Sequence, residues 1–498
     1  MELQFKKTDI NYLQPLKCFV QNQEQTQEIR LDDTMSQAEK VLGAWGQVIL
    51  RGKQWHSGSV QVSGGVMAWV LYEPEEGPAQ SVQTWVPFQT KMDIPHSEQD
   101  GRFLFNPMLR SVDARIVNGR KLLVRVDLGL QLCAWVPQTA GVYRPEELPE
   151  DVQVLRQTYP VRLPMETGEK EFAIDEILSL PGSCPVVQKL VCYRLHPELI
   201  DRKVMADKVV FRGCGLLHLL YEGTDGQLYS WDFELPFSQY ADLSGQYEQD
   251  ASAGIIPAIT SLELEQSPDG KLLLKAGLIG QFVIYDRMEL TVAEDAYSTR
   301  RALSPNKEML QLPVVLDMQT QSMHCEQTVP MAGTRIVDVA YLPDQPAPLH
   351  QENQVEIDLA GQFQMLCSDS QGRLEIASTG WAEQLAVAAD TDCQVRVFGT
   401  ISGTPAGVLS GQSATLRADM LLDMVTMTEQ EIPMITGIEL EEREEKPGDR
   451  PSVILRKPQG NSLWEIAKQT GSTVEAIEKA NGLTEKPMEE QMLLIPVV

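Results

Sequence analysis

Residues 66–88 read VMAWVLYEPEEGPAQSVQTWVPF, and residues 215–237 read GLLHLLYEGTDGQLYSWDFELPF. Both stretches contain a Leu-Tyr-Glu triplet, which begins at Leu71 in the first and at Leu220 in the second, and both end in Pro-Phe. The triplets and the Pro-Phe pairs recur at the same interval of 149 residues. A constant interval over two separate motifs predicts that this part of the chain is duplicated.

The interval persists outside these two stretches. Lys40 and Lys189 are also 149 residues apart. Further along, the interval is 150 or 151 residues, between Pro107 and Pro257, Ser111 and Ser261, and Asn118-Gly119 and Asp269-Gly270. A fainter third copy covers residues 355–376, where Gly372 follows Gly226 by 146 residues. Solenoid repeats are about 20–50 residues long, so a period near 150 indicates tandem domains instead.

The pattern inside each copy indicates β-structure. From Val355 to Met365, apolar residues alternate with mainly polar ones, which is typical of a half-buried strand. The Asn118-Gly119 and Asp269-Gly270 pairs lie between apolar stretches and favour hairpins with type I′ turns, and Ser410-Gly411 can take this place in the third copy. We therefore expect each copy to be an antiparallel β-sandwich or barrel. Five aromatic residues are expected to fill the cores: Trp69, Tyr72, Trp85, Tyr221 and Trp231.

The composition limits the function. The chain has 498 residues, with 42 Lys+Arg against 70 Asp+Glu, which gives a formal net charge of −28. An acidic surface repels phosphate groups, so nucleic acid and anionic lipid are poor partners. No apolar run reaches the roughly 18 residues of a membrane span, and the first residues do not resemble a secretory signal. The eight cysteines show no framework spacing, so we expect thiols in a reducing compartment, the cytoplasm.

The last part of the chain has a different pattern. Residues 431–450 are strongly acidic and are expected to form a solvated linker. Residues 451–498 predict a β-α-α-β module with strands at 453–455 and 492–496. Its first helix would be capped by Asn461 or Ser462 and its second by Ser472 or Thr473, with Gly471 and Asn481-Gly482 ending them. The inward positions are expected to be Leu463, Ile466, Ala467, Val474, Ile477 and Ala480.

This module resembles the LysM domain in Gly460-Asn461-Ser462-Leu463-Trp464, Ala480-Asn481 and Leu494-Ile495-Pro496. The resemblance implies a shallow groove for N-acetylglucosamine-containing glycans, between the loop before the first helix and the loop after the second. The corresponding groove residues, for glycan or partner, are Asn461, Ser462, Leu463, Trp464, Leu483, Pro487 and Met488. For Leu463 core packing is the preferred interpretation, and for Trp464 a scaffold or exposed contact. The segment from Pro487 to Gln491 lacks the glycine that LysM domains usually carry and adds two carboxylates, which changes one wall of the groove.

No set of residues predicts catalysis. The six histidines form no HExxH or Cys/His zinc spacing, and neither a GxSxG elbow nor a Walker A loop occurs. We therefore expect no enzyme activity, no metal and no cofactor.

The tandem copies, with their Leu-Tyr-Glu, Pro-Phe and Asp-Gly-Lys-Leu motifs, resemble the SPOCS domain (DUF3794). The predicted fold is thus mainly β, with SPOCS copies at residues 1–150, 151–300 and, more divergent, 301–430, then the linker and the LysM domain. SPOCS copies followed by one LysM domain resemble the SipL-type family of clostridial spore-coat morphogenetic proteins.

That resemblance implies a non-catalytic assembly protein in the mother-cell cytoplasm, at the forespore and spore-coat surface. Its implied partner is the coat-basement ATPase, stage IV sporulation protein A, which would bind the LysM domain. Two other readings stay open: a LysM protein that binds peptidoglycan of the cell wall or spore cortex, and a cell-wall hydrolase whose catalytic residues lie in a SPOCS copy.

Overall fold

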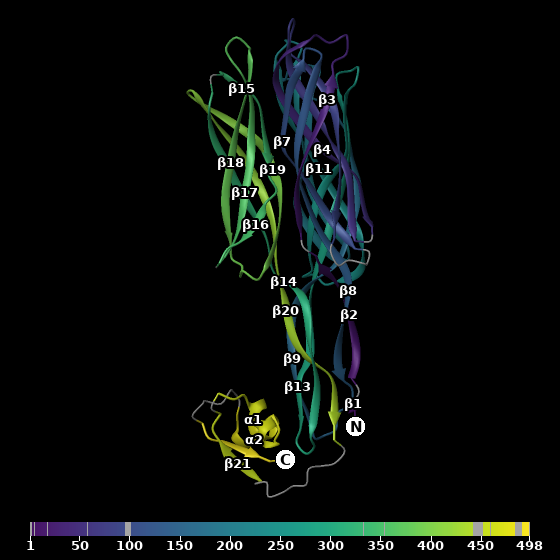
Figure 1. Cartoon of the computed structure of the whole chain (residues 1–498), viewed down its shortest axis with the longest axis vertical. Coiled ribbons are helices and arrows are strands. Elements are labelled where there is room, and N and C mark those ends of the chain that lie inside the picture. The colour runs from purple at the N-terminus through teal and green to yellow at the C-terminus, as the bar shows by residue number, and fades with distance from the viewer. Residues whose placement is uncertain are drawn as a thin grey trace.

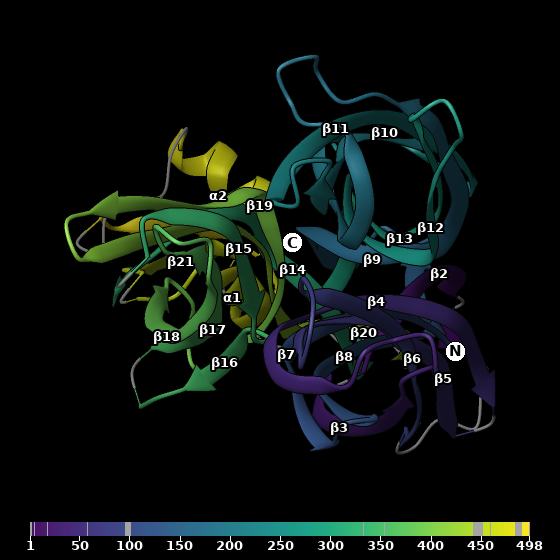
Figure 2. The ribbon, with the colours of Figure 1, turned by 90° about the horizontal axis from the view of Figure 1, so that it is seen from above.

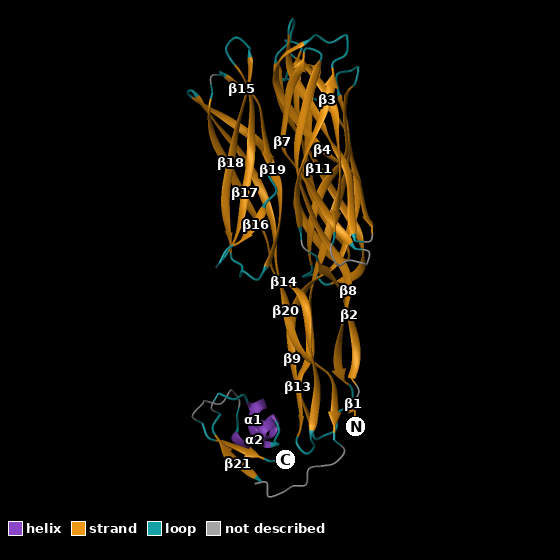
Figure 3. Cartoon of the chain, in the orientation of Figure 1, coloured by secondary structure: helices purple, strands orange, loops and turns teal. Residues whose placement is uncertain are grey.

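The computed structural model has a mainly β fold (Figure 3). It describes residues 2–3, 5–16, 18–56, 58–94, 101–331, 333–352, 354–441, 452–458, 460–483 and 491–497. Within these ranges all neighbouring strands pair in antiparallel fashion. Both helices of these ranges belong to the C-terminal module. The prediction of a mainly β, antiparallel chain is therefore confirmed. No helix in the described part of the chain is long and apolar enough to cross a membrane.

The first group of strands, which we call unit 1, consists of two sheets over one core. One sheet contains β2 (Phe5–Pro15), β3 (Phe19–Arg30), β7 (Arg102–Asn118) and β8 (Lys121–Pro145), and the other contains β4 (Ala38–His56), β5 (Ser59–Pro74) and β6 (Gln80–Asp93). In β8, Leu122, Val124, Val126 and Leu128 are fully buried, because alternate residues of a strand point to the same face.

The same arrangement recurs twice. Unit 2 contains β9 (Val152–Leu178), β10 (Val187–Gly223), β11 (Leu228–Tyr247), β12 (Ser252–Gln266) and β13 (Leu272–Ser298). Unit 3 contains β14 (Leu303–Pro330), β15 (Arg335–Pro343), β16 (Ala347–His350), β17 (Val355–Ser368), β18 (Leu374–Val387), β19 (Gln394–Ser410) and β20 (Ser413–Leu440). In every unit one long strand, β8, β13 or β20, pairs both with the strand before it and with an earlier strand. The short strand β1 (Glu2–Leu3) pairs with β20.

The three predicted hairpins are present, but the expected turn type is wrong at all three. They join β7 to β8, β12 to β13 and β19 to β20. A type I′ turn needs positive φ at both central residues, and Asn118, Asp269 and Ser410 all lack a positive φ. The Asn118 side chain instead accepts a hydrogen bond from the backbone N–H of Arg120 at 3.0 Å, and Gly270 alone has a φ of 81° in the second turn.

The expectation that the five aromatic residues fill the cores is correct for four of them. Tyr72, Tyr221 and Trp69 are buried, at 0%, 1% and 3% exposure. Trp231 is half-buried, lies in phase with the buried positions of β11, and packs against the core of unit 2. The expectation is wrong for Trp85, which is 38% exposed and lies one residue out of phase with the buried positions of β6, so that it faces outward.

The predicted linker is wrong over residues 431–440, which belong to β20. Ile432, Ile435 and Ile438 are fully buried there, and the segment pairs with β14. The glutamates that suggested a linker alternate with these apolar residues, as they do in a strand with one wet face. Most of the remaining linker, residues 442–450, lies outside the described residues.

The three units stand around a common axis, as Figure 2 shows from above. The ends of their long strands continue as a narrower stem made of the pairs β2–β8, β9–β13 and β14–β20 (Figure 1). The stem has its own apolar core, to which each pair contributes, for example Val142, Leu163 and Leu312. The C-terminal module lies beside the far end of this stem.

The expectation of eight free thiols is wrong, because Cys18 and Cys133 form a disulfide. The pairing of β3 with β8 places them opposite each other, and a spacing of 115 residues in the sequence gives no sign of this. The other six cysteines are free thiols.

Candidate functional site

The C-terminal module has the order β21 (Val453–Arg456), α1 (Leu463–Thr470), α2 (Val474–Asn481) and β22 (Leu493–Pro496), as the sequence predicts. Ser462 caps α1, and its backbone N–H donates to the Glu465 side chain, which completes a capping box. Thr473 caps α2. Gly471 and Gly482 end the helices in the left-handed conformation that glycine adopts at little cost.

The module has a small core on the helix side of its two-stranded sheet. The buried members are Ile466, Ala467, Ile477, Leu493 and Ile495. The expected inward position of Ala480 is wrong, since this residue is exposed. Asn481, one helical turn after the buried Ile477, faces β22 in place of Ala480. Its side chain donates to the Leu494 carbonyl at 2.6 Å and accepts from the Leu494 N–H at 2.8 Å. The amide thereby fastens α2 to β22.

Helix α1 docks on the end of β13 in the stem. The rings of Trp464 and Tyr297 pack edge-to-face with centroids 4.8 Å apart. The Trp464 indole N–H donates to Asp295 at 3.0 Å, and the Tyr297 hydroxyl donates to the Ser472 carbonyl at 2.8 Å. Tyr297 is 5% exposed and belongs to the apolar cluster of the module. These contacts hold the module in a defined orientation on the stem.

Asp295 is the acidic partner of two lysines at this interface. The Lys468 ammonium lies 2.6 Å from its carboxylate and the Lys307 ammonium 3.1 Å away. Burial disfavours the charged form, but the hydrogen bonds from Lys468, Trp464 and Lys307 outweigh it and hold the pKa of Asp295 below its usual range. The carboxylate is therefore ionised when it binds α1.

The predicted groove residues are used in several ways. Asn461 and Ser462 lie together at the start of α1, where the Ser462 hydroxyl accepts a hydrogen bond from the Glu465 N–H at 3.2 Å. Leu463, Trp464 and Leu483 all pack against the apolar cluster of the module. Pro487 and Met488 lie outside the described residues.

The face of β21 and β22 that points away from the helices is apolar and exposed, and sequence reasoning missed it. Its members are Val453, Leu455, Met492 and Leu494, at 47%, 66%, 55% and 38% exposure. Leu455 pairs directly with Leu494, so the side chains form one patch, which we call the outer strand face. The signal in the sequence is that consecutive residues are apolar, Val453-Ile454-Leu455 in the first strand and Met492-Leu493-Leu494-Ile495 at the second, so that the outer face is apolar as well as the inner one.

A second polar cluster lies where the units meet. The Asp338 carboxylate of unit 3, with a side chain 1% exposed, accepts from Trp45 of unit 1 at 2.8 Å and from Arg194 of unit 2 at 3.0 and 3.2 Å. The ring of His218 lies 2.7 Å from Asp338 and 2.6 Å from Asp232. Burial opposes the charge of Asp338, but Arg194 and His218 outweigh it and lower its pKa. One buried carboxylate thus joins all three units.

Further contacts close a ring around the axis. Gln131 of unit 1 donates to the Val397 carbonyl of unit 3 at 2.7 Å. Gln281 of unit 2 donates to the Phe105 carbonyl of unit 1 and accepts from the Phe105 N–H, at 2.9 Å each. Arg202 of unit 2 donates to the Asp423 carboxylate of unit 3 at 2.6 and 2.7 Å. Lys53, which precedes Arg202 by the repeat interval of 149 residues, donates to Gln281 at 2.5 Å. Each unit is therefore held by both of the others.

A cavity of about 160 Å³ lies at this junction, and all three units line it. It is walled mainly by apolar groups such as Met108, Leu216 and Ile401. Burial lowers the pKa of His196 in its wall to about 3, so this ring is neutral at pH 7. In the described parts of the chain, no group of three or more His, Cys, Asp or Glu residues is arranged to hold a metal ion.

The comparisons with known proteins give one match. A family model described as "SipL, SPOCS domain" matches residues 187–265, which contain β10, β11 and nearly all of β12. No curated protein and no solved structure matches the chain. The family match supports a sporulation-related protein with a role in protein–protein interaction. The chain therefore contains a SPOCS domain of the SipL type.

Proposed function

We propose that this protein is a non-catalytic adaptor of spore-coat assembly. It binds the coat-basement ATPase, stage IV sporulation protein A, through its C-terminal LysM-like module, and so localises coat material around the forespore in the mother cell. The family match at residues 187–265 and the sequence resemblance of the module support this function.

The observation that carries the proposal is the outer strand face. Exposed apolar patches on soluble proteins mark contacts with other macromolecules, because contact between apolar surface and water is unfavourable. The module docks on the stem through α1, so the outer strand face stays accessible on the opposite side of its sheet. The net charge of −28 would in addition steer the chain toward a basic surface of the partner.

The test measures binding of the purified full chain to the purified ATPase by biolayer interferometry. Leu455→Lys places a charge in the patch and is expected to weaken binding by about 10- to 30-fold, as truncation of a central interface residue does. Ile177→Lys on β9 is the matched control, because Ile177 and Leu455 are both 66% exposed. This control should bind like the unchanged protein.

Two results would count against the proposal. In one, the unchanged chain does not bind the ATPase. In the other, the Leu455 and Ile177 variants bind equally. Displacement of the ATPase by N-acetylglucosamine oligomers, together with capture of the full chain on purified sacculi, would favour the peptidoglycan-binding alternative.

A further inference from the structure

The Cys18–Cys133 disulfide lies at an interruption of the sheet in unit 1. β2 ends opposite Trp135 of β8, and β3 begins opposite Leu132. The connection is one residue longer than the stretch of the continuous strand β8 between these two pairs, as in a β-bulge, and the Leu16 N–H donates to the Ala134 carbonyl at 2.8 Å. The disulfide bridges this interruption and ties the β2–β3 connection to β8.

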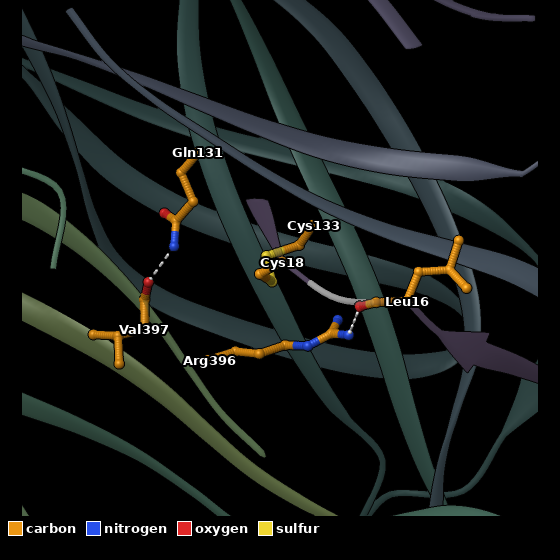
Figure 4. The surroundings of a disulfide bond; sticks show 6 residues. All are labelled: Leu16, Cys18, Gln131, Cys133, Arg396 and Val397. Atoms are coloured by element: carbon orange, nitrogen blue, oxygen red, sulfur yellow. Dashed lines mark hydrogen bonds between the residues drawn. A yellow bond between two sulfur atoms is a disulfide. The ribbon is translucent and has the colours of Figure 1, made fainter. Parts of the chain in front are cut away.

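Both segments joined by the disulfide also bind unit 3. The Arg396 guanidinium donates to the Leu16 carbonyl at 2.7 Å, and the Gln131 amide donates to the Val397 carbonyl at 2.7 Å (Figure 4). Leu16 precedes Cys18 by two residues, and Gln131 precedes Cys133 by two. Arg396 and Val397, which are consecutive residues of β19, thus each contact one of these two segments of unit 1. The disulfide is the covalent link between the two segments at this point.

Arg396 makes the position of Leu16 important. Its side chain is a buried cation, at 3% exposure, and its guanidinium lies over the Trp135 ring, 4.8 Å from the centroid. Burial lowers the pKa of Arg396 to about 10. Within the described residues its Nη1 atom has no hydrogen-bond partner, so loss of the Leu16 carbonyl would remove an acceptor that a buried charge needs.

We propose that the Cys18–Cys133 pair is a redox clasp that controls how tightly unit 1 is held against unit 3. A thiolate of a dithiol reductant attacks the partly exposed Cys18 sulfur, and the S–S bond breaks. The second thiol of the reductant then resolves the mixed disulfide. The two cysteines together gain two electrons and two protons, and the reductant becomes a disulfide. The covalent tie of Cys18 to β8 is then lost while the hydrogen bond from the Leu16 N–H to the Ala134 carbonyl remains, so that the Leu16–Arg396 contact opens more often.

The test compares hydrogen exchange of the full chain before and after treatment with dithiothreitol. Reduction is expected to speed exchange by about ten-fold in peptides that cover the β2–β3 connection and the start of β19, as a local opening does. The contact between unit 2 and unit 1, at Gln281 and Phe105, is expected to show no change. Mass spectrometry of alkylated samples gives the number of free thiols in each state.

Two variants sharpen the result. Cys18→Ser should show the exchange pattern of the reduced chain and no response to dithiothreitol. Cys214→Ser, which changes a partly exposed free thiol in unit 2, away from the disulfide of unit 1, should keep the full response. Equal exchange in the oxidised and reduced chain would overturn the clasp, and so would faster exchange spread evenly over all three units. Eight free thiols after treatment with an oxidised dithiol would also overturn it.

Discussion

The ring of Trp464 packs edge-to-face on the ring of Tyr297, with their centroids 4.8 Å apart. This contact attaches α1 of the C-terminal module to the end of β13 in the stem. Because the helices cover one side of the β21–β22 sheet, the contact also determines which side remains open. Trp464, which the LysM resemblance places at the glycan groove, thus makes an intramolecular contact that orients the module.

Replacing Trp464 by alanine is expected to release the module from the stem. The change removes half-buried aromatic surface and the hydrogen bond to Asp295, at a cost of about 2 kcal/mol in docking free energy. Hydrogen exchange in the peptides that cover α1 and the end of β13 would rise accordingly. Trp464→Phe keeps a ring against Tyr297 and should restore part of the protection; equal effects of the two variants would contradict the packing argument.

Docking of the module should weaken in acid. The pKa of Asp295 is lower in the folded chain than the ordinary value of about 3.9. Its ionised form therefore adds stability that is fully present above that value and is lost as the pH falls through the lowered pKa. Exchange at α1 should stay constant from pH 7 to about pH 4 and rise below it, after correction for intrinsic rates. In Asp295→Asn, exchange should be faster at pH 7 and its extra rise in acid should disappear.

Asp338→Asn is expected to be one of the most destabilising single changes in the chain. It leaves the Arg194 guanidinium and His218 buried beside a neutral group, which costs about 3–5 kcal/mol of unfolding free energy. Asp419→Asn is the control, because the His324–Asp419 pair is exposed, with side chains 82% and 51% accessible. Urea unfolding should show a large loss for the first variant and little change for the second.

Stability should also fall as the pH rises above the ordinary pKa of histidine, because of His218. Burial lowers the pKa of this residue, but the carboxylates of Asp338 and Asp232 outweigh burial and raise it overall. A raised folded pKa means that protonated His218 adds stability below its ordinary pKa of about 6.5, and that this stability is lost as the pH rises through the folded value. Thermal unfolding of the unchanged chain should show a falling Tm over this window. His218→Gln should lack that slope, and an identical slope in both chains would contradict the assignment.

Sequence periodicity was sufficient for the features that depend on local chemistry. The alternation in residues 355–365 predicts strand β17. The cap candidates, Asn461 or Ser462 and Ser472 or Thr473, predict the start of each helix to within a residue, and Gly471 and Asn481-Gly482 predict the ends. Caps and left-handed termini are decided by the residues next to them, which is why these predictions hold.

Features that depend on which strands meet could not be predicted in this way. The Cys18–Cys133 bond follows from the register of β3 on β8, and the Asp338 cluster needs side chains from three units. Residues 431–440 look like an acidic linker until β14 is placed beside them. The intramolecular contact of Trp464 likewise depends on the stem, which no local pattern describes.

Hydrogen exchange of the full chain with and without the purified ATPase tests the proposed function most directly. The proposal predicts that the partner protects residues 453–456 and 492–496, which carry the outer strand face, and leaves the contact of Trp464 with Tyr297 as protected as before. Protection confined to the three units, with these two segments unchanged, would contradict it.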